Sequence, residues 1–513
     1  MKSSIRRKLR KHQRRVEAHT RRRREHRELK SRAYGEPVIS TQSRAYDLSE
    51  RSHGISCGGV PLLLKIAHRI GLVDAIDRNV HVLKLWLPYR ESDHVLNFAI
   101  NAWCDGQRLE DMELRRNDFA FLEAIGAETL PDPTTAGDFC RRFNAASIRS
   151  LQDAIDEARL NVWGRQSRDF FAEAIIEMDG LMAETTGNCK QGMDINHNCE
   201  WGYHPLVTTL ANTKELLSIV NRPGNRPSHE GAPAEADRAI ALCLRGGFRR
   251  IRLRGDTDFS LTAHFDRWNA QGVIFEFGFD ASPTMKALAE CLGNSDWTKL
   301  SRPAKYEVKT TPRERPDNVK REIIRQRNYL HLELKSEEVA EFNYKPVACE
   351  QEYRVVVVRK NISREKGDQV LFDEIRYFFY ITNDWNKSAE EVVFSCNDRC
   401  DQENILAQLS GGVRALTAPV DKLESNWAYM VMTSLAWTMK SWMALLLPVL
   451  KRWEGQHNEE RQTLLKMEFR TFMNAFIRIP CQIVHQARRV VLRVLAYNPH
   501  LPTFFRLCDV LQM

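Results

Sequence analysis

The chain has 513 residues with 43% hydrophobic and 28% charged side chains, a globular balance that suits two to four domains of about 150 residues. No run reaches the ~18 apolar residues of a membrane helix, and no apolar run follows the basic N-terminus. The sequence therefore argues against an integral membrane protein and against a secreted one. Twelve scattered cysteines without a CxxC pair argue against a disulfide scaffold or a zinc ribbon and favour a reducing compartment.

Positive charge is concentrated at the start of the chain. Residues 1–32 hold 15 Lys or Arg and 3 Glu, whereas the rest holds 61 basic and 64 acidic side chains. Like charges at this density repel one another, which predicts a basic flexible arm over 1–53, either disordered or a frayed helix. A cation placed at a phosphate releases a counterion, so we expect the arm, including Arg21, Arg22, Arg23 and Arg24, to bind nucleic acid. An acidic membrane surface, RNA and a purely solvating role are the alternatives.

Apolar residues recur at helical spacing over residues 54–165, which predicts a helical domain. The last two of its segments are short helices across a tight turn, and the second ends in Arg141 and Arg142. This arrangement is typical of a helix-turn-helix unit that contacts DNA, although ordinary helical packing explains it equally well. The expected helices lie at Leu62–Leu72, Ser92–Cys104, Asp118–Ile125 and 134–142.

The pattern changes at residue 174 to strands that alternate with helices, which predicts an α/β core. Its first part is expected over 166–299, with strands at Ala174–Met178, Ile251–Leu253 and Val273–Phe277, a hairpin of Leu206–Asn212 with Glu215–Asn221, and helices at Pro233–Arg245 and Leu261–Asn269. A β-rich insertion over 300–385 is marked by Tyr353–Val358 and Ile375–Ile381, and 386–455 completes the core with a buried helix at Ser425–Met439. A C-terminal helical region is expected over 456–513, with Arg488, Arg489 and Arg493 forming a basic face on a late helix.

Two carboxylates follow apolar strands directly: Asp179 after AIIEM and Asp256 after IRLRG. An unpaired charge beside apolar packing costs several kcal/mol, so each carboxylate needs a compensating cation or hydrogen bonds. Glu403, in the helical stretch Asn397–Leu409, is a third candidate. Three carboxylates from separate elements could hold two Mg²⁺ or Mn²⁺ ions, which suit hard oxygen ligands and phosphodiester chemistry.

Each of these carboxylates also has a plainer interpretation. Aspartates commonly end strands because they favour turns, and a glutamate on an amphipathic helix is commonly an exposed one. On spacing alone, Glu177 shares a strand face with Asp179, and Asp258 lies two residues after Asp256. The residues by themselves therefore indicate possible metal-dependent phosphodiester chemistry and nothing finer.

Other constellations carry weaker signals. Cys189, His197, Cys199 and His204 fall within 16 residues, but their spacing fits no standard zinc finger. Trp201 and Trp385 could stack on an extruded base, although aromatic residues more commonly pack in a core. The basic face of Arg488, Arg489 and Arg493 is compatible both with DNA contact and with solvation.

Several blocks of sequence, in order, resemble the bacterial insertion-sequence transposases with a DDE catalytic domain of ribonuclease-H-like fold, in the subgroup related to the piggyBac transposases. The resemblance covers residues 54–510. It is carried by GGVPLLLKIAHRIGL at 58–72, RLEDMELRRNDFAFLEAIGAETLPDPTTAGDFCRRF at 108–143, IIEMDG at 175–180, GYHPLV at 202–207, NRPGN at 221–225, RGDTDF at 254–259 and RCDQENILAQL at 399–409. It implies an α/β ribonuclease-H-like catalytic core with a β-rich insertion, flanked by an N-terminal helical DNA-binding domain and C-terminal helices.

The resemblance also implies roles for single residues. Asp179, Asp256 and Glu403 take the places of the catalytic, metal-binding carboxylates of the family, with Mg²⁺ or Mn²⁺ as the two ions of the site. Arg399 matches the arginine that grips a phosphate near the cleaved DNA end. The family's tyrosine and lysine positions around the glutamate are here Cys396 and Ser410, which puts the usual handling of a flipped end base in doubt.

The function that the resemblance implies is a DNA transposase that binds terminal inverted repeats, cleaves the element ends and joins their 3′-hydroxyls to target DNA. Cut-and-paste transposition is expected, with a hairpin intermediate by analogy with the piggyBac relatives. The resemblance implies that the partner is double-stranded DNA and that the protein acts as a homodimer or larger assembly. It also implies a location in the cytoplasm of a bacterium. The alternatives are a related metal-dependent nuclease, an inactive or repurposed DNA-binding relative, and RNA binding through the arm.

Overall fold

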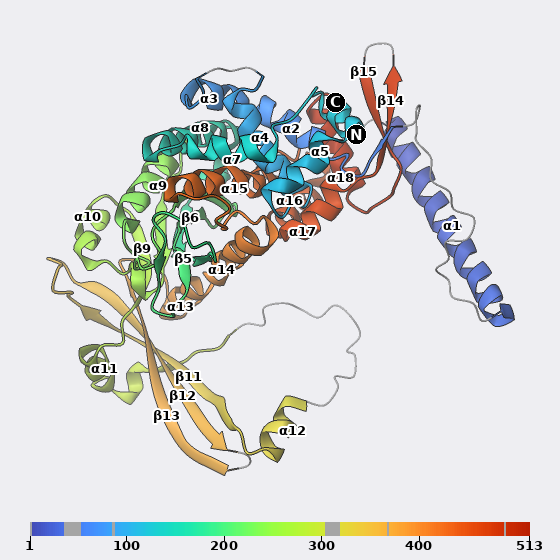
Figure 1. Cartoon of the computed structure of the whole chain (residues 1–513). Helices are drawn as coiled ribbons and strands as arrows, with labels where there is room; N and C mark the ends of the chain where they lie inside the picture. The colour runs from blue at the N-terminus through green and yellow to red at the C-terminus, as the bar shows by residue number, and fades with distance from the viewer. Residues whose placement is uncertain (1–2, 35–52, 85–87, 303–318, 367–368, 487–488) are drawn as a thin grey trace.

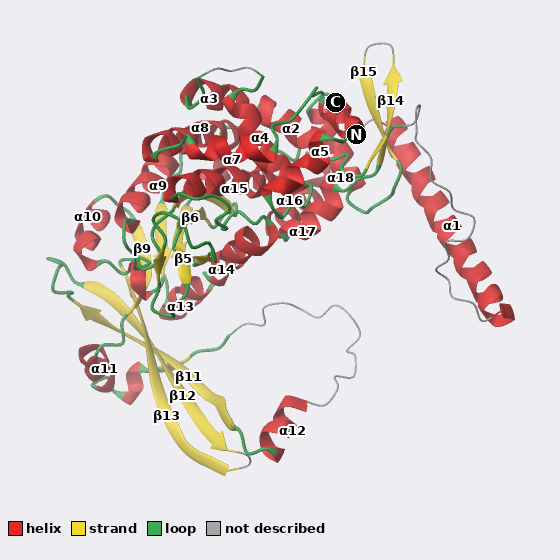
Figure 2. Ribbon diagram, in the orientation of Figure 1, coloured by secondary structure: helices red, strands yellow, loops and turns green. Residues whose placement is uncertain are grey.

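The chain forms a helical body with a large sheet at one end (Figure 1). The computed structural model describes residues 3–34, 53–84, 88–302, 319–366, 369–486 and 489–513. Helix α1 (Ser3–Tyr34) and the hairpin of β14 (Cys481–Gln486) and β15 (Arg489–Val494) project from the helical end. At the other end, the long strands of the sheet extend away from the helical body (Figure 2). None of the described helices is long and apolar enough to cross a membrane.

Nine strands form one mixed sheet in the order β10-β11-β12-β13-β9-β8-β2-β6-β7. Strand β8 runs parallel to both of its neighbours, β2 and β9, whereas β6 pairs antiparallel with β2 and β7. Buried strands are rich in apolar residues, which is how the sequence located these five strands, although β2 and β8 also bury Glu177, Arg252 and Arg254. The predicted α/β class is confirmed. The strands are β2 Ala174–Gly180, β6 Leu206–Leu210, β7 Glu215–Val220, β8 Ile251–Gly255 and β9 Ile274–Phe279, and α9 (Ala232–Gly246) and α10 (Phe265–Ala270) precede β8 and β9.

The strand-rich insertion continues this sheet. Strand β13 (Gln369–Thr382) pairs antiparallel with β9 through Phe379–Thr382, and β12 (Tyr353–Lys366) and β11 (Leu330–Tyr344) extend the ladder outward. The strands predicted here are confirmed, and β11 joins them. Short elements complete the region: α11 (Pro283–Glu290), β10 (Thr298–Lys299) and α12 (Val319–Gln326).

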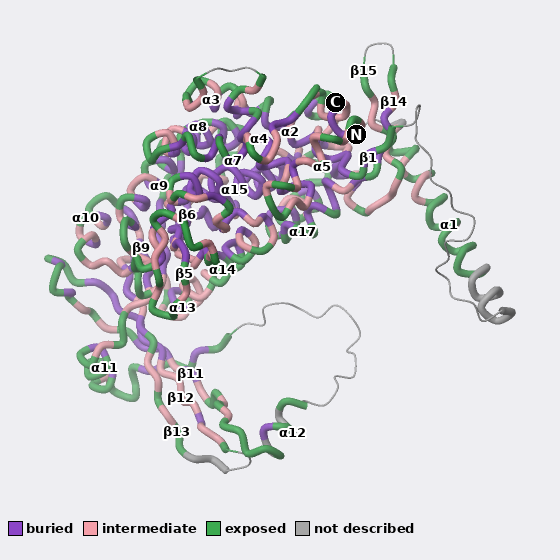
Figure 3. Tube along the Cα trace, viewed as in Figure 1, coloured by how far each residue is buried: buried purple, intermediate pink, exposed green. Residues whose placement is uncertain are grey.

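Helix α15 (Leu423–Leu445) lies at the centre of the body and is buried nearly all round, as the sequence predicted for Ser425–Met439 (Figure 3). A cation within it is fully enclosed: Lys440 donates to the carbonyls of Leu465 and Met467 at 2.9 and 2.7 Å and lies over the ring of Trp437. These carbonyls end α16 (Glu454–Lys466), so Lys440 caps one helix from within another.

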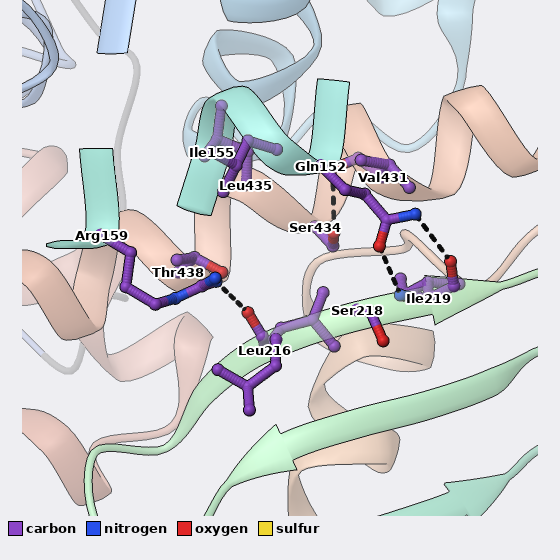
Figure 4. A pocket seen from close by; sticks show the side chains of 11 residues that line it. Gln152, Ile155, Arg159, Leu216, Ser218, Ile219, Val431, Ser434, Leu435 and Thr438 are labelled. Atoms are coloured by element: carbon purple, nitrogen blue, oxygen red, sulfur yellow. Dashed lines mark hydrogen bonds between the residues drawn. The ribbon is translucent and has the colours of Figure 1, made fainter. Parts of the chain in front are cut away.

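Helix α8 (Ala145–Trp163) fastens the helical body to strand β7. Gln152 bonds both backbone groups of Ile219, and the guanidinium of Arg159 donates to the carbonyl of Leu216 (Figure 4). Between these contacts and α15 remains a cavity of about 20 Å³, room for about one water molecule. The sheet is therefore held to the helices by buried polar contacts as well as by apolar packing.

The predicted helices of residues 54–165 are present. Aspartates cap the two short ones, Asp118 accepting from the Phe121 N–H and Asp132 from the Thr135 N–H. The second buries Ala136, Phe139 and Cys140 and packs against α15, so one of its faces is committed to the core. The helices are α2 Val60–Arg69, α3 Leu72–Asn79, α4 Glu91–Trp103, α6 Phe119–Ile125 and α7 Pro133–Arg141.

One of the two expectations for the ends of the chain needs correction. The described part of the basic arm is the long helix α1, the helical one of the two forms expected for it, with Leu9 packed against the core. The C-terminal region is not helical throughout: α17 (Phe469–Phe472) and α18 (Leu501–Val510) flank the hairpin β14–β15, which pairs with β1 (Gly54–Ile55). Arg489 and Arg493 thus lie on a strand, and Arg488 lies outside the described residues.

Candidate active site

Strand register brings the two candidate aspartates together. Strands β2 and β8 run parallel with Ala174 opposite Ile251 and Glu177 opposite Arg254. The same register, continued two residues, sets Asp179 opposite Asp256 at the carboxyl edge of the sheet. Neighbouring strands are ~4.8 Å apart, so the two carboxylates are lateral neighbours. The carboxyl edge is also where open α/β sheets bind their ligands.

Backbone hydrogen bonds orient both carboxylates. Oδ1 of Asp179 accepts from the Gly180 N–H at 2.8 Å. Oδ1 of Asp256 accepts from the Asp258 N–H at 3.0 Å and so caps the short helical turn that follows β8. In each residue Oδ2 makes neither of these backbone hydrogen bonds and is the oxygen that lies near Arg399.

Arg399 lies between the two aspartates. Its Nη1 is 3.5 Å from Oδ2 of Asp179, and its Nη2 is 3.2 Å from Oδ2 of Asp256. The Arg399 side chain is only 14% exposed, and Nη1 is buried without a hydrogen bond that meets normal geometry. The guanidinium thus compensates two like charges at once, with spare donor capacity.

Glu403 lies on the same side of the site, one turn after Arg399 on α14 (Cys400–Ala407). Neighbouring contacts hold that helix on the sheet: Gln402 donates to the carbonyl of Val207, and Asp401 pairs with Lys214 at 2.6 Å. Val207 is the residue of β6 that pairs with Asp179, so α14 crosses the sheet beside that aspartate. Glu403 itself is exposed.

The electrostatics of Asp179 reflect this crowding. Burial is the largest cause and, together with the charges of Asp256 and Glu403, raises the pKa of Asp179 from 3.8 to about 6, while Arg399 and the Gly180 N–H oppose the rise. A carboxylate with a raised pKa beside two others is an under-compensated cluster of negative charge. A bound cation would supply the positive charge that this cluster lacks.

The competing carboxylates have other surroundings. Glu177 is fully buried and pairs with Arg254 at 2.6 Å, across β2 and β8, and burial raises the pKa of its carboxyl. Arg254 also donates to the carbonyl of Ser395 at the end of α13 (Ala389–Asn397), so this pair positions the segment that carries Arg399. Asp258 is exposed on the turn after β8.

His204, which the sequence analysis considered only as a zinc ligand, lies next to the site. His204 lies so close to Gly180 that a Cβ there would be 2.7 Å from its Nε2. Its Nδ1 lies 2.9 Å from the carbonyl oxygen of Arg226, and burial lowers the pKa of its ring. The absence of a side chain at residue 180 is what lets the imidazole pack beside the Asp179 strand end.

The remaining predicted residues lie apart from this cluster. Arg141 pairs with Asp138 and Asp421, Arg142 is exposed, and Arg21–Arg24 lie exposed on α1. Cys396, at the family's tyrosine position, packs with the apolar cluster under β12, and burial raises the pKa of its thiol. Ser410 is half-buried in a short π-helical turn.

The donor set suits a hard divalent cation, yet its spacing is not that of a formed metal centre. Among the residues that the structure describes, no group of three or more His, Cys, Asp or Glu side chains is arranged as metal ligands. The Arg399 guanidinium lies between Asp179 and Asp256, at the place where a shared ion would bind. Binding such an ion requires Arg399 to move off the two carboxylates.

Comparison with known proteins identifies the family. The chain matches the Transposase DDE domain group 1 family over residues 52–513. No curated protein sequence matches it. Among solved structures, a cryo-EM structure of the piggyBac transposase synaptic complex with hairpin DNA is similar over 81% of this chain and 88% of that one, with 10% sequence identity and a TM-score of 0.35. The family match spans nearly the whole chain and confirms the predicted transposase family: the chain belongs to the DDE-domain transposases of group 1.

Proposed function

We propose that this transposase binds the terminal inverted repeats of its own insertion sequence, cleaves the element ends and joins the freed 3′-hydroxyls to target DNA. The observation that carries the proposal is the pair Asp179 and Asp256, adjacent on parallel strands, under-compensated and bridged by one arginine. The strand order β7-β6-β2-β8-β9 supports a ribonuclease-H-like core around that pair.

In this proposal Asp179, Asp256 and Glu403 hold two Mg²⁺ or Mn²⁺ ions. Bound ions of this kind activate a water or a 3′-hydroxyl and stabilise the leaving oxygen of a phosphodiester. The backbone N–H groups of Gly180 and Asp258 keep each aspartate turned so that Oδ2 faces the site. Glu403 completes the carboxylate set from α14.

Arg399 has two partners in the proposed cycle. Before ions bind, its guanidinium neutralises Asp179 and Asp256. If the two aspartates held ions, Arg399 would be released from them and could bind a DNA phosphate, since a guanidinium binds phosphate with strong charge-assisted hydrogen bonds. Cys396 and Ser410 stand where the family resemblance sets a tyrosine and a lysine, so a hairpin intermediate would form without those two side chains.

The assembly and place of action follow from the reaction. Two element ends must be paired, so we propose a homodimer or larger assembly on double-stranded DNA, acting in the cytoplasm of its bacterial host. The exposed arginines of α1, together with Arg142, are proposed to hold DNA phosphates.

The test is an assay of binding, cleavage and strand transfer, scored separately, with labelled element-end DNA and Mg²⁺. Asp179→Asn is expected to keep DNA binding and to lose cleavage and joining. Asp169→Asn, an exposed aspartate just ahead of the amino end of β2, is the matched control and is expected to cleave like the wild type. Equal cleavage by wild type and Asp179→Asn would overturn the assignment. Cleavage without joined products would favour a nuclease, and binding without metal-dependent cleavage a DNA-binding relative.

A further inference from the structure

The hairpin β14–β15 has two chemically different faces. Its antiparallel register pairs Gln482 with Arg493, Val484 with Val491 and Gln486 with Arg489, so these six residues share one face. On this outer face both glutamines and both arginines are exposed and the two valines half-buried. The Arg489 Nε donates to the Gln486 side chain at 3.3 Å, which keeps the polar groups at the free end of the hairpin side by side.

The opposite face anchors the hairpin. Cys481 and Ile483 are buried there, and Leu492 and Val494 pack against the hydrophobic core. The Ile483 N–H donates to the carbonyl of His53, and the Gly54–Ile55 strand pairs with the base of β14. Farther out, one carboxylate holds two histidines: Glu123 on α6 is 2.8 Å from His53 Nδ1 and 2.5 Å from His485 Nε2. The hairpin is therefore a fixed ribbon with its outer face in solvent.

The chain segment that contains the ribbon is rich in arginine. Between Glu468 and Asp509 the sequence contains no Asp or Glu, whereas it contains six arginines, of which Arg478 and Arg506 pair with Asp105 and Glu460. The nearby carboxylate of Glu123 is already occupied by its two histidines. Two of the six arginines, Arg489 and Arg493, lie exposed on the outer face, and its other polar side chains are uncharged amides. An anionic partner fits this face.

The shape of the ribbon narrows the class of anion. A strand of six residues is ~20 Å long, and two paired strands ~5 Å apart fit the major groove of B-form DNA, which is about 12 Å wide. Arginine and glutamine are the side chains that read guanine and adenine edges there with paired hydrogen bonds. In an A-form RNA duplex the major groove is too narrow and deep for such an element.

We propose that the outer face of β14–β15, through Gln482, Gln486, Arg489 and Arg493, lies in the major groove of duplex DNA and contacts its phosphates and base edges. The proposal deepens the proposed function, because it names a DNA-reading element remote in sequence from both the basic arm and the expected helix-turn-helix unit. It assigns the two arginines to affinity and the two glutamines to sequence preference.

The first experiment measures affinity for a fluorescein-labelled 40-base-pair duplex of random sequence by anisotropy, from 50 to 200 mM KCl without divalent ions. The double variant Arg489→Ala/Arg493→Ala is expected to bind about tenfold more weakly at 100 mM KCl, with a log–log salt slope smaller by about two. The control Arg249→Ala/Arg250→Ala removes the same charge from two exposed residues just ahead of the amino end of β8. It is expected to stay within about twofold of the wild type. A general effect of lost positive charge would weaken both variants alike, so the control separates that effect from a specific contact.

The second experiment tests the glutamines. Sequences selected by the wild type from a random duplex pool are compared with random DNA, and Gln482→Ala/Gln486→Ala is expected to lose at least about fivefold of that preference while keeping its affinity for random DNA. All altered side chains are exposed, so the thermal unfolding midpoint should not move.

Three outcomes would overturn the proposal. The first is an unchanged affinity and salt slope in the double arginine variant, and the second is an equal loss in the Arg249→Ala/Arg250→Ala control. The third is an equal loss on an RNA duplex of the same sequence, which would indicate general polyanion binding. Cleavage is assayed separately, so the two proposals can fail independently. A protein that binds DNA through the ribbon but does not cleave would refute the proposed function alone. A protein that cleaves but whose ribbon variants bind DNA like the wild type would refute this inference alone.

Discussion

Two carboxylate sites in this protein, one fully enclosed and one partly exposed, are compensated to very different degrees. Glu215, at the start of β7, is fully enclosed and accepts from four donors: two on α8, one on α15 and one in the turn just before β7. The indole nitrogens of Trp163 and Trp442, the hydroxyl of Thr213 and the guanidinium of Arg159 lie 2.5–3.2 Å from its oxygens. Every lone pair has a partner, so this charge holds strand, α8 and α15 together.

Asp179 is the opposite case. It receives one backbone hydrogen bond and shares Arg399 with Asp256 at the longer distances of 3.5 and 3.2 Å. Its pKa is raised to about 6, mainly by burial. A cluster that the fold leaves under-compensated is suited to an external cation, whereas a saturated one serves the fold itself. The predictions below test this contrast, beginning with the largest expected change.

Removing the saturated carboxylate should damage the fold most. Glu215→Ala leaves the guanidinium of Arg159 buried beside Asp156 without its second carboxylate and two indoles without acceptors. We expect a loss of ~3–5 kcal/mol in the free energy of unfolding, measured by urea denaturation. Glu157→Ala is the matched control on α8, because it breaks an exposed pair with Arg78, and it should cost no more than about 1 kcal/mol. Equal losses in the two variants would contradict the contrast.

Removing the under-compensated carboxylate should stabilise the metal-free protein. The raised pKa of Asp179 means that the folded state favours the protonated form, so stability is lost as pH rises from 3.8 through about 6. Asp179→Asn removes this loss. In EDTA, its stability relative to the wild type should increase between pH 4 and pH 7 by at most ~3 kcal/mol. A variant less stable than the wild type at pH 7 would show that Asp179 is a structural residue.

Removing the arginine that Asp179 and Asp256 share should destabilise the metal-free protein. Arg399→Gln leaves Asp179 and Asp256 facing each other without compensation, and we expect a loss of about 1–2 kcal/mol at pH 7 in EDTA. In an Asp179→Asn background the same substitution should cost less, because only one charge then remains to be compensated. Identical costs in the two backgrounds, measured by a double-mutant cycle, would mean that the arginine acts elsewhere.

The smallest effect is expected from two arginines on the protein surface, of which one is paired with carboxylates, and it is measured as a change in DNA affinity. Arg141 and its neighbour Arg142 are both exposed, but Arg141 is paired with the carboxylates of Asp138 and Asp421. Arg142→Ala should therefore weaken DNA binding by several-fold in fluorescence anisotropy, while Arg141→Ala should change it less. A larger loss in Arg141→Ala than in Arg142→Ala would contradict this expectation and would assign the DNA contact to Arg141.

The sequence predicted the core strands because each contains several apolar residues and ends near a polar turn, and the family resemblance marked the carboxylates. It could not predict register, which alone makes Asp179 and Asp256 neighbours and sets Glu177 against Arg254. The helix expected around Arg489 and Arg493 was wrong because their spacing of four fits a helical face. The β-branched run between them, Val490 and Val491, indicated the strand that the structure contains.

Strand β11 was also missed. It lies inside the interval 300–385 that was expected to be rich in strands, but it was not located as a separate strand, although Leu330, Leu332 and Leu334 alternate with polar residues at the spacing of a strand. Arg399 was placed at the site by resemblance only. Its bridge between two aspartates depends on how α14 crosses the sheet, and that crossing is set by contacts far apart in sequence, such as Gln402 with Val207.

The most direct test of the central claim is Mn²⁺ binding, measured by isothermal titration calorimetry on the wild type, Asp179→Asn, Asp256→Asn and Glu403→Gln, with Asp169→Asn as the control. The account predicts that the wild type and the control bind Mn²⁺ and that each of the three carboxylate variants loses most of that binding while remaining folded. Wild-type affinity in all three variants would contradict it and would place the divalent-ion site elsewhere in the chain.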